Sequence, residues 1–326
     1  MQRSFAELEF GAKKKRTRRE RFLAELDALT PWAELQAQIE PFYPRGQGRG
    51  RPPMGLARML RMYLVQQCLG LSDEGMEDAV YDSQAIRSFL GIDLAREAAP
   101  DATTLLKFRR LLERHGLTQA IFGAINAHLS ARGLLLREGS IVDATIISAP
   151  SSTKNARGER DPEMHQSKKG QQWYFGMKAH IGVDRDSGLV HTVVGTPAHV
   201  SDVTVGHRLL HGQERSVLAD AGYQGAHKRG EATATTWLVA ARPGVRRAWR
   251  KDGHAGRLLD WVERLKASVR AKVEHAFHVL KNRFGLKKLR YRGLAKNTAQ
   301  LFTLFAMANL QIAKRRLFAL DARGVS

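Results

Sequence analysis

The first 135 residues carry apolar positions spaced three or four residues apart, a pattern that predicts helices. One helix is expected over residues 55–69. Another begins after Ser72, whose hydroxyl suits a helix N-cap. Two more helices are expected, the first capped by Asp101 or Thr103, over residues 101–114 and 121–132. The first part of the chain is therefore predicted to be all helical.

After residue 139 the pattern changes to short runs rich in Val and Ile, which predict strands. Strands are expected over residues 140–147, 175–183, 189–195, 216–219 and 237–241. The polar stretch 151–172 is predicted to be a long loop, and residues 203–210 a helix. The first three strands have short connections and are expected to pair antiparallel. The later two follow a helical crossover and can add in parallel.

A long helix is predicted over residues 258–284, where one apolar stripe runs through Trp261, Leu265, Val269, Val273, Phe277, Leu280 and Phe284. The chain is therefore expected to have an α/β fold, with a mixed sheet flanked by helices and an all-helical domain before it. The predicted boundary divides residues 1–135 from residues 136–326.

The composition indicates a folded protein that binds a polyanion. The chain has 53 Lys and Arg against 32 Asp and Glu, a formal charge of +21, so nucleic acid is the expected partner. Its single cysteine, Cys68, excludes a disulfide framework and a cysteine-cluster zinc site. The most apolar run, residues 301–308, is too short to span a bilayer, and no signal peptide is recognisable. A cytoplasmic protein that does not bind membranes is expected.

The positive charge gathers in three clusters, within residues 13–21, 242–251 and 281–292. No Asp or Glu occurs between His275 and Leu320. A solvated charged face normally mixes signs, so this acid-free stretch predicts a phosphate-facing surface. Its candidate DNA-binding residues are Lys287, Lys288 and Arg290.

Three acidic residues occupy positions where a carboxylate is costly. Asp143 lies inside a predicted buried strand, Asp220 ends a strand before a glycine-containing turn, and Glu274 lies beside the apolar stripe of the long helix. Carboxylates without thiolates suit hard cations such as Mg²⁺ or Mn²⁺. Two such ions can activate a water or hydroxyl and stabilise the leaving oxygen of a phosphodiester.

Structural roles remain open for each of these carboxylates, because a strand Asp can bond locally and a strand-end Asp often forms an Asx turn. Rival acids are Asp184 and Asp186, which fit a tight turn, and Asp202, which fits a helix N-cap.

Arg270, Glu274 and Lys281 are four and seven residues apart, so they share one face of the predicted helix. Cations on both sides of a metal-binding carboxylate could hold DNA phosphates near the ion. The alternative is an intrahelical pair between Arg270 and Glu274, worth only about 0.3–0.5 kcal/mol.

At these residues the chain resembles the DDE transposases of bacterial insertion sequences, in the insertion-sequence-five-type group with a ribonuclease-H-like core. The segments that match its catalytic motifs are Val142-Asp143-Ala144-Thr145, Ala219-Asp220-Ala221-Gly222-Tyr223 and Arg270-x3-Glu274-x6-Lys281. The resemblance runs from about residue 40 to 315 and includes Trp173 to His180 and Asn282-Arg283-Phe284. Ala267 stands where the family often has a Tyr, so no role of that phenol is carried over.

The resemblance implies that Asp143, Asp220 and Glu274 are catalytic and hold two Mg²⁺ ions, with Mn²⁺ able to substitute. It implies cleavage at the ends of a mobile element and attack of the freed 3′-hydroxyl on target DNA, with Arg270 and Lys281 positioning phosphates. Lys178 and His180, one strand away, are further candidates for DNA contact; alternate strand residues that face solvent are an equal alternative.

The resemblance also implies that residues 1–135 bind the terminal inverted repeats and contribute to dimerisation, and that residues 136–326 form the catalytic domain. The expected assembly is a homodimer on double-stranded DNA, associated with the bacterial nucleoid. Arg49 and Arg51 could form a minor-groove hook, although a proline-led entry into the next helix is favoured. A catalytically silent DNA-binding regulator and a nuclease of the same fold are the alternative functions.

Overall fold

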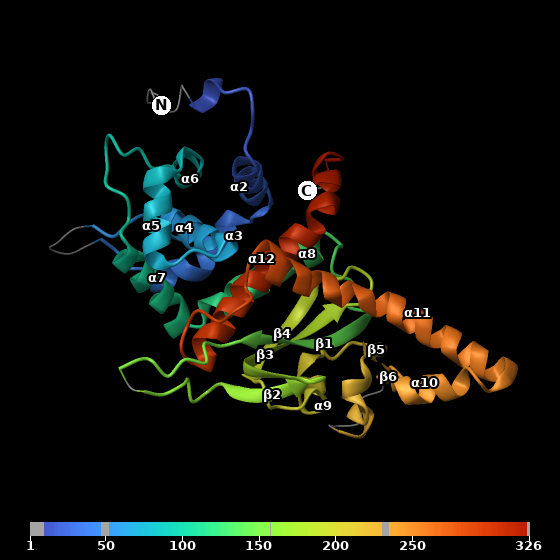
Figure 1. The fold of residues 1–326 in the computed structure, drawn as a ribbon. Coiled ribbons are helices and arrows are strands. Elements are labelled where there is room, and N and C mark those ends of the chain that lie inside the picture. Colours follow the sequence, from blue (N-terminus) through green and yellow to red (C-terminus); the bar gives the residue numbers. More distant parts are fainter. Residues whose placement is uncertain (1–9, 47–51, 157, 230–234, 325–326) are drawn as a thin grey trace. The chain divides into compact units, whose positions relative to one another are not determined.

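The computed structural model describes residues 10–46, 52–156, 158–229 and 235–324 (Figure 1). Contacts divide the chain into two compact units, Met1–Ile125 and Asn126–Ser326. The division falls inside helix α8, Leu117–Ala131. Among the described residues, no helix combines the length and apolar character needed to cross a membrane.

The first unit is helical, as predicted. Besides the first part of α8 it contains α2 (Arg18–Leu29), α3 (Trp32–Ile39), a short 3-10 turn η1 (Glu40–Phe42), α4 (Leu56–Leu69), α5 (Asp73–Asp82), α6 (Gln84–Leu90) and α7 (Ala102–Arg114). Helix α4 forms the centre of the core, because nine of its residues between Met59 and Cys68 are buried.

Local side chains fix where these helices begin. The Ser72 hydroxyl accepts a hydrogen bond from Gly75 N at 2.9 Å, and Asp101 Oδ1 accepts one from Thr104 N at 2.6 Å. Both predicted caps are thereby confirmed, and Asp101 rather than Thr103 is the one used. Thr17 and Glu20 form a capping box at the start of α2, so this helix begins within the first basic cluster.

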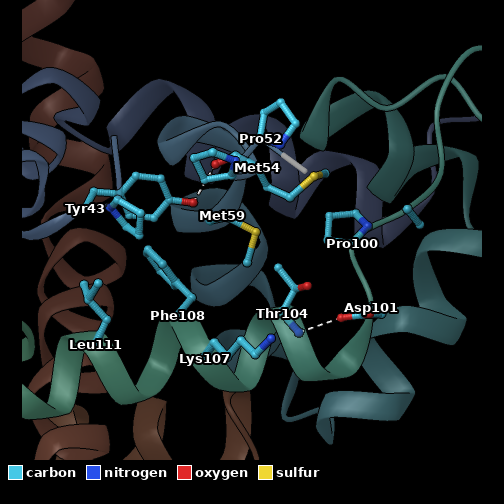
Figure 2. A pocket seen from close by; sticks show the side chains of 13 residues that line it. Tyr43, Pro52, Met54, Met59, Pro100, Asp101, Thr104, Lys107, Phe108 and Leu111 are labelled. Carbon is cyan, nitrogen blue, oxygen red and sulfur yellow. Dashed lines mark hydrogen bonds between the residues drawn. The ribbon is translucent and has the colours of Figure 1, made fainter. Parts of the chain in front are cut away.

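A pocket of about 340 Å³ opens between α4, α7 and the segments before them (Figure 2). Its wall contains Met59, Phe108 and Leu111, and Tyr43 Oη donates a hydrogen bond to the Met54 carbonyl at 2.5 Å across its rim. This hydrogen bond ties the segment before α4 to the end of η1.

The second unit is built on a six-stranded mixed sheet. Its strands are β1 (Gly139–Ser148), β2 (His165–Lys169), β3 (Gln172–Asp184), β4 (Val190–Pro197), β5 (Ser216–Ala219) and β6 (Thr236–Val239). Strand β3 pairs antiparallel with β1, β2 and β4, whereas β5 lies parallel to β1 and to β6. The predicted pairing directions are confirmed. The prediction of a loop throughout residues 151–172 is wrong for β2, a polar strand at the edge of the sheet.

Helices α11 (Gly253–His278) and α12 (Leu294–Asp321) pack on the sheet. Asn309 of α12 fixes the start of β4, because its Oδ1 accepts from Val190 N at 2.8 Å and its Nδ2 donates to Val190 O at 2.7 Å. The remaining helical pieces are α9 (Asp202–Val205), η2 (Gly206–Leu209), η3 (Ala221–Tyr223), η4 (Ala226–Lys228) and α10 (Pro243–Trp249).

Helix α11 differs from its prediction at both ends. It begins at Gly253, and after His278 it continues as a π-helical segment η5, Val279–Arg283. Its stripe is also buried over only part of its length. Val273 and Phe277 are buried, whereas Trp261 and Leu265 are 54% and 46% exposed on the part that extends beyond the sheet with α10 (Figure 1). The residue spacing predicted the apolar stripe but not which part of the stripe is buried by other elements.

Candidate active site

Two parallel strands bring the first two predicted carboxylates together. Val142 of β1 is in register with Ala219 of β5, so Asp143 and Asp220 follow at neighbouring positions. Both backbones are fixed by the sheet up to that point, because β1 is hydrogen-bonded on both sides. Asp143 therefore lies on a central strand, and Asp220 lies where the adjacent strand ends.

Asp220 is the N-cap of the 3-10 turn η3. Its Oδ1 accepts a hydrogen bond from Gly222 N at 2.8 Å, which orients the carboxylate. A Cβ on Gly222 would come within 2.9 Å of this oxygen and 3.5 Å of Asp202 Oδ2. Glycine is therefore needed for the close approach of the turn to two carboxylates.

Helix α11 contributes the third carboxylate. Asp143, Asp220 and Glu274 all line one polar cavity of about 570 Å³, together with Arg270 and Lys281. The structure thus brings five predicted residues, separated by up to 138 positions in the chain, into a single site.

Acidic and basic side chains share the cavity, because Lys169, Arg270 and Lys281 line it together with the three carboxylates. Burial, together with the charges of Asp220 and Glu274, raises the pKa of Asp143 to about 6. The hydrogen bond from Ala144 N, at 2.7 Å, and the nearby Arg270 guanidinium act in the opposite direction without cancelling the rise. Burial is the largest of these causes, so the raised pKa reports mainly the loss of water around Asp143.

The two predicted cations are held differently. Lys281 Nζ donates to Thr145 Oγ1 at 2.6 Å and to the Ile146 carbonyl at 3.2 Å, so it is tied to β1 beyond Asp143. Burial and the nearby Lys169 lower its pKa, against the effect of Glu274. Arg270 Nε is buried and has no hydrogen-bond partner among the described residues. The Nε hydrogen is therefore without an acceptor in a side chain that lines the cavity.

Lys169, His278 and Asn282 also line the cavity and were not selected from the sequence as site residues. Asn282 Nδ2 lies 2.9 Å from His278 Nδ1, one turn apart along the end of α11. Lys169 belongs to the strand that was predicted to be a loop. The spacing of His278, four residues after Glu274, was a signal that could have identified it.

Comparison with known protein families accounts for this geometry. The family model described as "Transposase DDE domain" matches residues 135–310, a range that contains all three carboxylates. The chain belongs to this family. A second model, "Transposase domain (DUF772)", matches residues 11–111 of the helical part. The DDE transposase assignment made from the motifs is confirmed.

Among solved structures, the chain is similar to the cryo-EM structure of a piggyBac transposase synaptic complex with hairpin DNA. The TM-score is 0.48 at 10% sequence identity, over 90% of this chain and 73% of that one. A likeness at this level says nothing about individual residues.

A DDE transposase domain implies dependence on a divalent metal ion, and the cavity fits one. Its acidic donors are hard carboxylate oxygens, and repulsion by Asp220 and Glu274 adds to burial in raising the pKa of Asp143. A divalent cation would relieve that repulsion. Asp143, Asp220 and Glu274 would hold it.

Lys178 and His180 of the transposase do not line the cavity. Lys178 Nζ binds Asp202 Oδ1 at 2.9 Å and the Val200 carbonyl at 2.7 Å. The His180 side chain is fully buried, its Nε2 lies 2.8 Å from Thr196 Oγ1, and burial lowers its pKa to about 4. The expected DNA contact of His180 does not fit this placement, because the neutral ring has no exposed surface.

The third basic cluster of the transposase lies where β1 ends. Leu289 N donates to the Ser148 carbonyl at 2.9 Å, which places the cluster a few residues beyond Thr145. Lys287 and Lys288 are exposed, and Arg290 is half-buried, which lowers its pKa. Arg49 and Arg51 lie outside the described residues.

Proposed function

We propose that this transposase binds the terminal inverted repeats of its element, cleaves the DNA ends and transfers the 3′-hydroxyl to target DNA. The observation that supports this best is the convergence of Asp143, Asp220 and Glu274 on one cavity beside Arg270. Asp143 and Asp220 each accept one local hydrogen bond among the described residues, whereas the structural carboxylate of Asp184 accepts several.

The three carboxylates would hold two Mg²⁺ ions, with Mn²⁺ able to substitute. When bound, these ions activate the attacking water or 3′-hydroxyl and stabilise the leaving oxygen. The chain supplies the positions: β1 and β5 fix Asp143 and Asp220 at neighbouring points, and α11 brings Glu274 to them. The fixed donor set orients the reacting phosphodiester for an in-line attack.

The cations of the cavity would bind the DNA backbone. Arg270 is placed to bind a non-bridging phosphate oxygen, because its Nε has no partner among the described residues. Lys281 is held by Thr145 and adds positive potential at a fixed point.

The DNA path would continue from the cavity towards the end of β1. Lys169 lines the cavity, and Lys288 lines an adjoining hollow with Arg160 and the exposed Trp173. This alternation of basic and aromatic side chains suits a nucleic-acid backbone and its bases. Lys287 and Arg290 belong to the same proposed surface.

The remaining assignments are also proposals. The helical residues 1–135 would bind the inverted repeats, and residues 136–326 would catalyse. For Arg49 and Arg51 a minor-groove hook remains the alternative to the favoured proline-led entry into the next helix. The insertion-sequence-five-type group is proposed from the motif resemblance alone.

A strand-nicking and joining assay tests the proposed function. Labelled DNA carrying the sequences that flank the gene is incubated with wild type, Asp220→Asn and Asp186→Asn, in Mg²⁺, Mn²⁺ or EDTA. Asp186 is the matched control, because it lies in the β3–β4 turn away from the cavity. We expect metal-dependent nicking and joined product in wild type and Asp186→Asn only. Nicking without joining would indicate a nuclease, and specific binding without nicking a silent regulator.

We also propose that the transposase acts as a homodimer on DNA. The outer part of α11 exposes Leu258, Trp261, Val262 and Leu265, and a contiguous apolar surface of this kind marks an interaction site. A second copy suits it, since each of two element ends needs a catalytic cavity.

Light scattering with and without an end-sequence duplex tests this assembly. Leu258→Lys is expected to lower the dimer fraction. Arg257→Lys, at the preceding position, is the control and should leave the dimer fraction unchanged. A wild-type protein that stays monomeric on DNA would contradict the proposal.

A further inference from the structure

A second cluster of metal-ligand side chains lies on the same sheet, apart from the catalytic cavity. His191 of β4, His211 of the loop before β5, and Glu214 of the same loop each present one ligand atom, and these atoms lie within 4.8 Å of one another. None of the three lines the catalytic cavity.

The fold holds each side chain in place. Glu214 is buried, and its carboxylate accepts from His211 N at 2.6 Å and from Gly212 N at 2.8 Å. His191 lies beside the register shift between Gly182 and Val183. A Cβ on Gly182 would come within 2.6 Å of His191 Cε1, so glycine makes room for the ring.

Hydrogen bonds satisfy the polar side-chain atoms of two of the three residues, His191 and Glu214. Ser140 Oγ donates to Glu214 Oε1 at 3.0 Å and lies 2.9 Å from His191 Nε2. His191 Nδ1 lies 2.9 Å from Thr192 Oγ1. A purely structural network would account for these contacts.

His211 is the exception. Its side chain is 9% exposed, and its buried Nε2 has no hydrogen-bond partner among the described residues. This nitrogen lies 3.4 Å from Glu214 Oε1, in an orientation that makes no hydrogen bond. Leaving a buried polar atom unsatisfied costs about 1–3 kcal/mol, so a native protein normally provides a partner.

We propose that His191, His211 and Glu214 bind a divalent transition-metal ion of the zinc type, separate from the catalytic metal site. Two imidazoles and one carboxylate are donors that zinc accepts, whereas Mg²⁺ prefers oxygen ligands alone. The Ser140 hydroxyl or a water completes the coordination. The ion gives His211 Nε2 the partner that it lacks.

The protonation states favour this role. Burial lowers the pKa of His191 to about 4, and burial also lowers the pKa of His211, so both rings are neutral at neutral pH. Hydrogen bonds from His211 N and neighbouring groups lower the pKa of Glu214 despite its burial, so its carboxylate is charged. Metal binding requires His191 Nε2 to lose its contact with the Ser140 hydroxyl. It also requires His211 Nδ1 to give up the hydrogen bond that it accepts from Gln213 N at 3.2 Å.

The ion would link β4 and the loop before β5, with Ser140 of β1 beside it. Ser140 lies three residues before Asp143, and Glu214 lies six residues before Asp220. The proposed site is therefore structural. It fixes the starts of β1 and β5, and the residues that follow include the catalytic carboxylates of Asp143 and Asp220. It does not depend on the proposed function, which concerns other side chains.

Cobalt substitution tests the site in the full-length, tag-free chain. The background is Asp143→Asn/Asp220→Asn, which removes catalytic carboxylates, and metal is stripped with a chelator. We expect one equivalent of Co²⁺ to give the visible absorption of a low-coordinate nitrogen–oxygen site, which Zn²⁺ abolishes and excess Mg²⁺ does not. In His211→Gln and His191→Gln the affinity is expected to fall roughly 100-fold or more. His254→Gln, which changes an exposed histidine, is the matched control.

The absence of a Co²⁺ spectrum, or an unchanged spectrum in His211→Gln, would overturn the proposal. Circular dichroism in chelator shows whether the variants fold. If they do not, wild-type protein is treated with diethyl pyrocarbonate with and without Zn²⁺. Protection of His191 and His211, measured by peptide mass spectrometry, supports the site, and equal modification contradicts it.

Discussion

Asp143 and Asp184 are aspartates on two paired strands of one sheet, and their surroundings are opposite. Asp184 is fully buried at the end of β3, where its carboxylate accepts from Arg137 N, Asp186 N, Ser187 N and Ser187 Oγ at 2.6–3.1 Å. These bonds lower its pKa although burial acts to raise it. Asp143 accepts one backbone hydrogen bond and faces two other carboxylates, and its pKa is raised to about 6.

This difference shows what distinguishes a structural carboxylate from one that can take part in catalysis. Asp184 is fully buried and Asp143 is partly buried, so the more buried carboxylate is the structural one and burial alone does not identify a site. The turn after β3 supplies Asp184 with three donors and Arg137 N before β1 supplies a fourth, whereas Asp143 accepts one backbone hydrogen bond beside the cavity.

The largest effect is expected on the catalytic side. Asp143→Asn is expected to reduce strand transfer by about a thousandfold or more, because the variant loses a charged donor of the metal site. Its stability in EDTA should stay level or rise, because a repelling charge is removed. Parallel joining assays and thermal melts measure both, and a variant with near wild-type joining would contradict the assignment.

On the structural side, Asp184→Ala is expected to destabilise the protein by about 4 kcal/mol, because it leaves buried donors without an acceptor. The fraction that remains folded should retain specific activity. Urea unfolding gives the free energy. Asp186→Ala, in the same turn, is the control and should change stability little.

The pH dependence should have opposite signs for the two residues. The folded-state pKa of Asp143 lies above its ordinary value, so its contribution favours folding in acid and is lost as pH rises from about 4 to about 6. A shift of about two pKa units corresponds to about 3 kcal/mol.

The folded-state pKa of Asp184 is lowered, so its contribution is present above pH 4 and is lost as pH falls. Unfolding free energies from pH 3 to 7 in EDTA test both, with Asp143→Asn and Asp184→Asn as the comparison. A wild-type pH profile that Asp143→Asn leaves unchanged would contradict the predicted sign for Asp143.

The smallest expected effect is the change that Mg²⁺ causes in the free energy of unfolding. Millimolar Mg²⁺ is expected to stabilise wild type by about 2 kcal/mol, because it binds the folded cavity and not the unfolded chain. Asp143→Asn/Asp220→Asn should show no gain, and Asp186→Asn the full gain. Equal stabilisation of all three would mean that the ion binds elsewhere.

The sequence predicted the features that depend on local chemistry or on connection lengths. Ser72 and Asp101 cap their helices through bonds to residues three positions away, so their role is visible in a short window. The antiparallel pairing of β3 with β4 follows from their short connection, and the parallel pairing of β5 with β1 and β6 follows from crossover connections. Asp143 and Asp220 were identifiable because a charge inside or at the end of a strand is unusual, whereas Glu274 is exposed and was identified by its spacing from Arg270 and Lys281.

Features that depend on distant neighbours were not predictable. Strand β2 is polar and exposed, so it lacks the alternation that marks a half-buried strand, and Lys169 was missed with it. His180 and a solvent-facing residue look alike in sequence, and only the fold shows that Thr196 and Asp202 surround the ring. Trp261 and Leu265 continue the apolar stripe of α11, and the sequence does not show that no other element buries them.

The π-helical segment Val279–Arg283 has a consequence for how this enzyme can vary. Phe284 N bonds to Val279 O, five residues back, so this turn contains one residue more than an α-helical turn. Deleting one residue would turn Phe284, now 2% exposed, by about 100° relative to Glu274 and would pull Lys281 from Thr145. The number of residues here is under a tighter constraint than their identity. Gaps should therefore be rarer than substitutions at this point in functional variants of the chain.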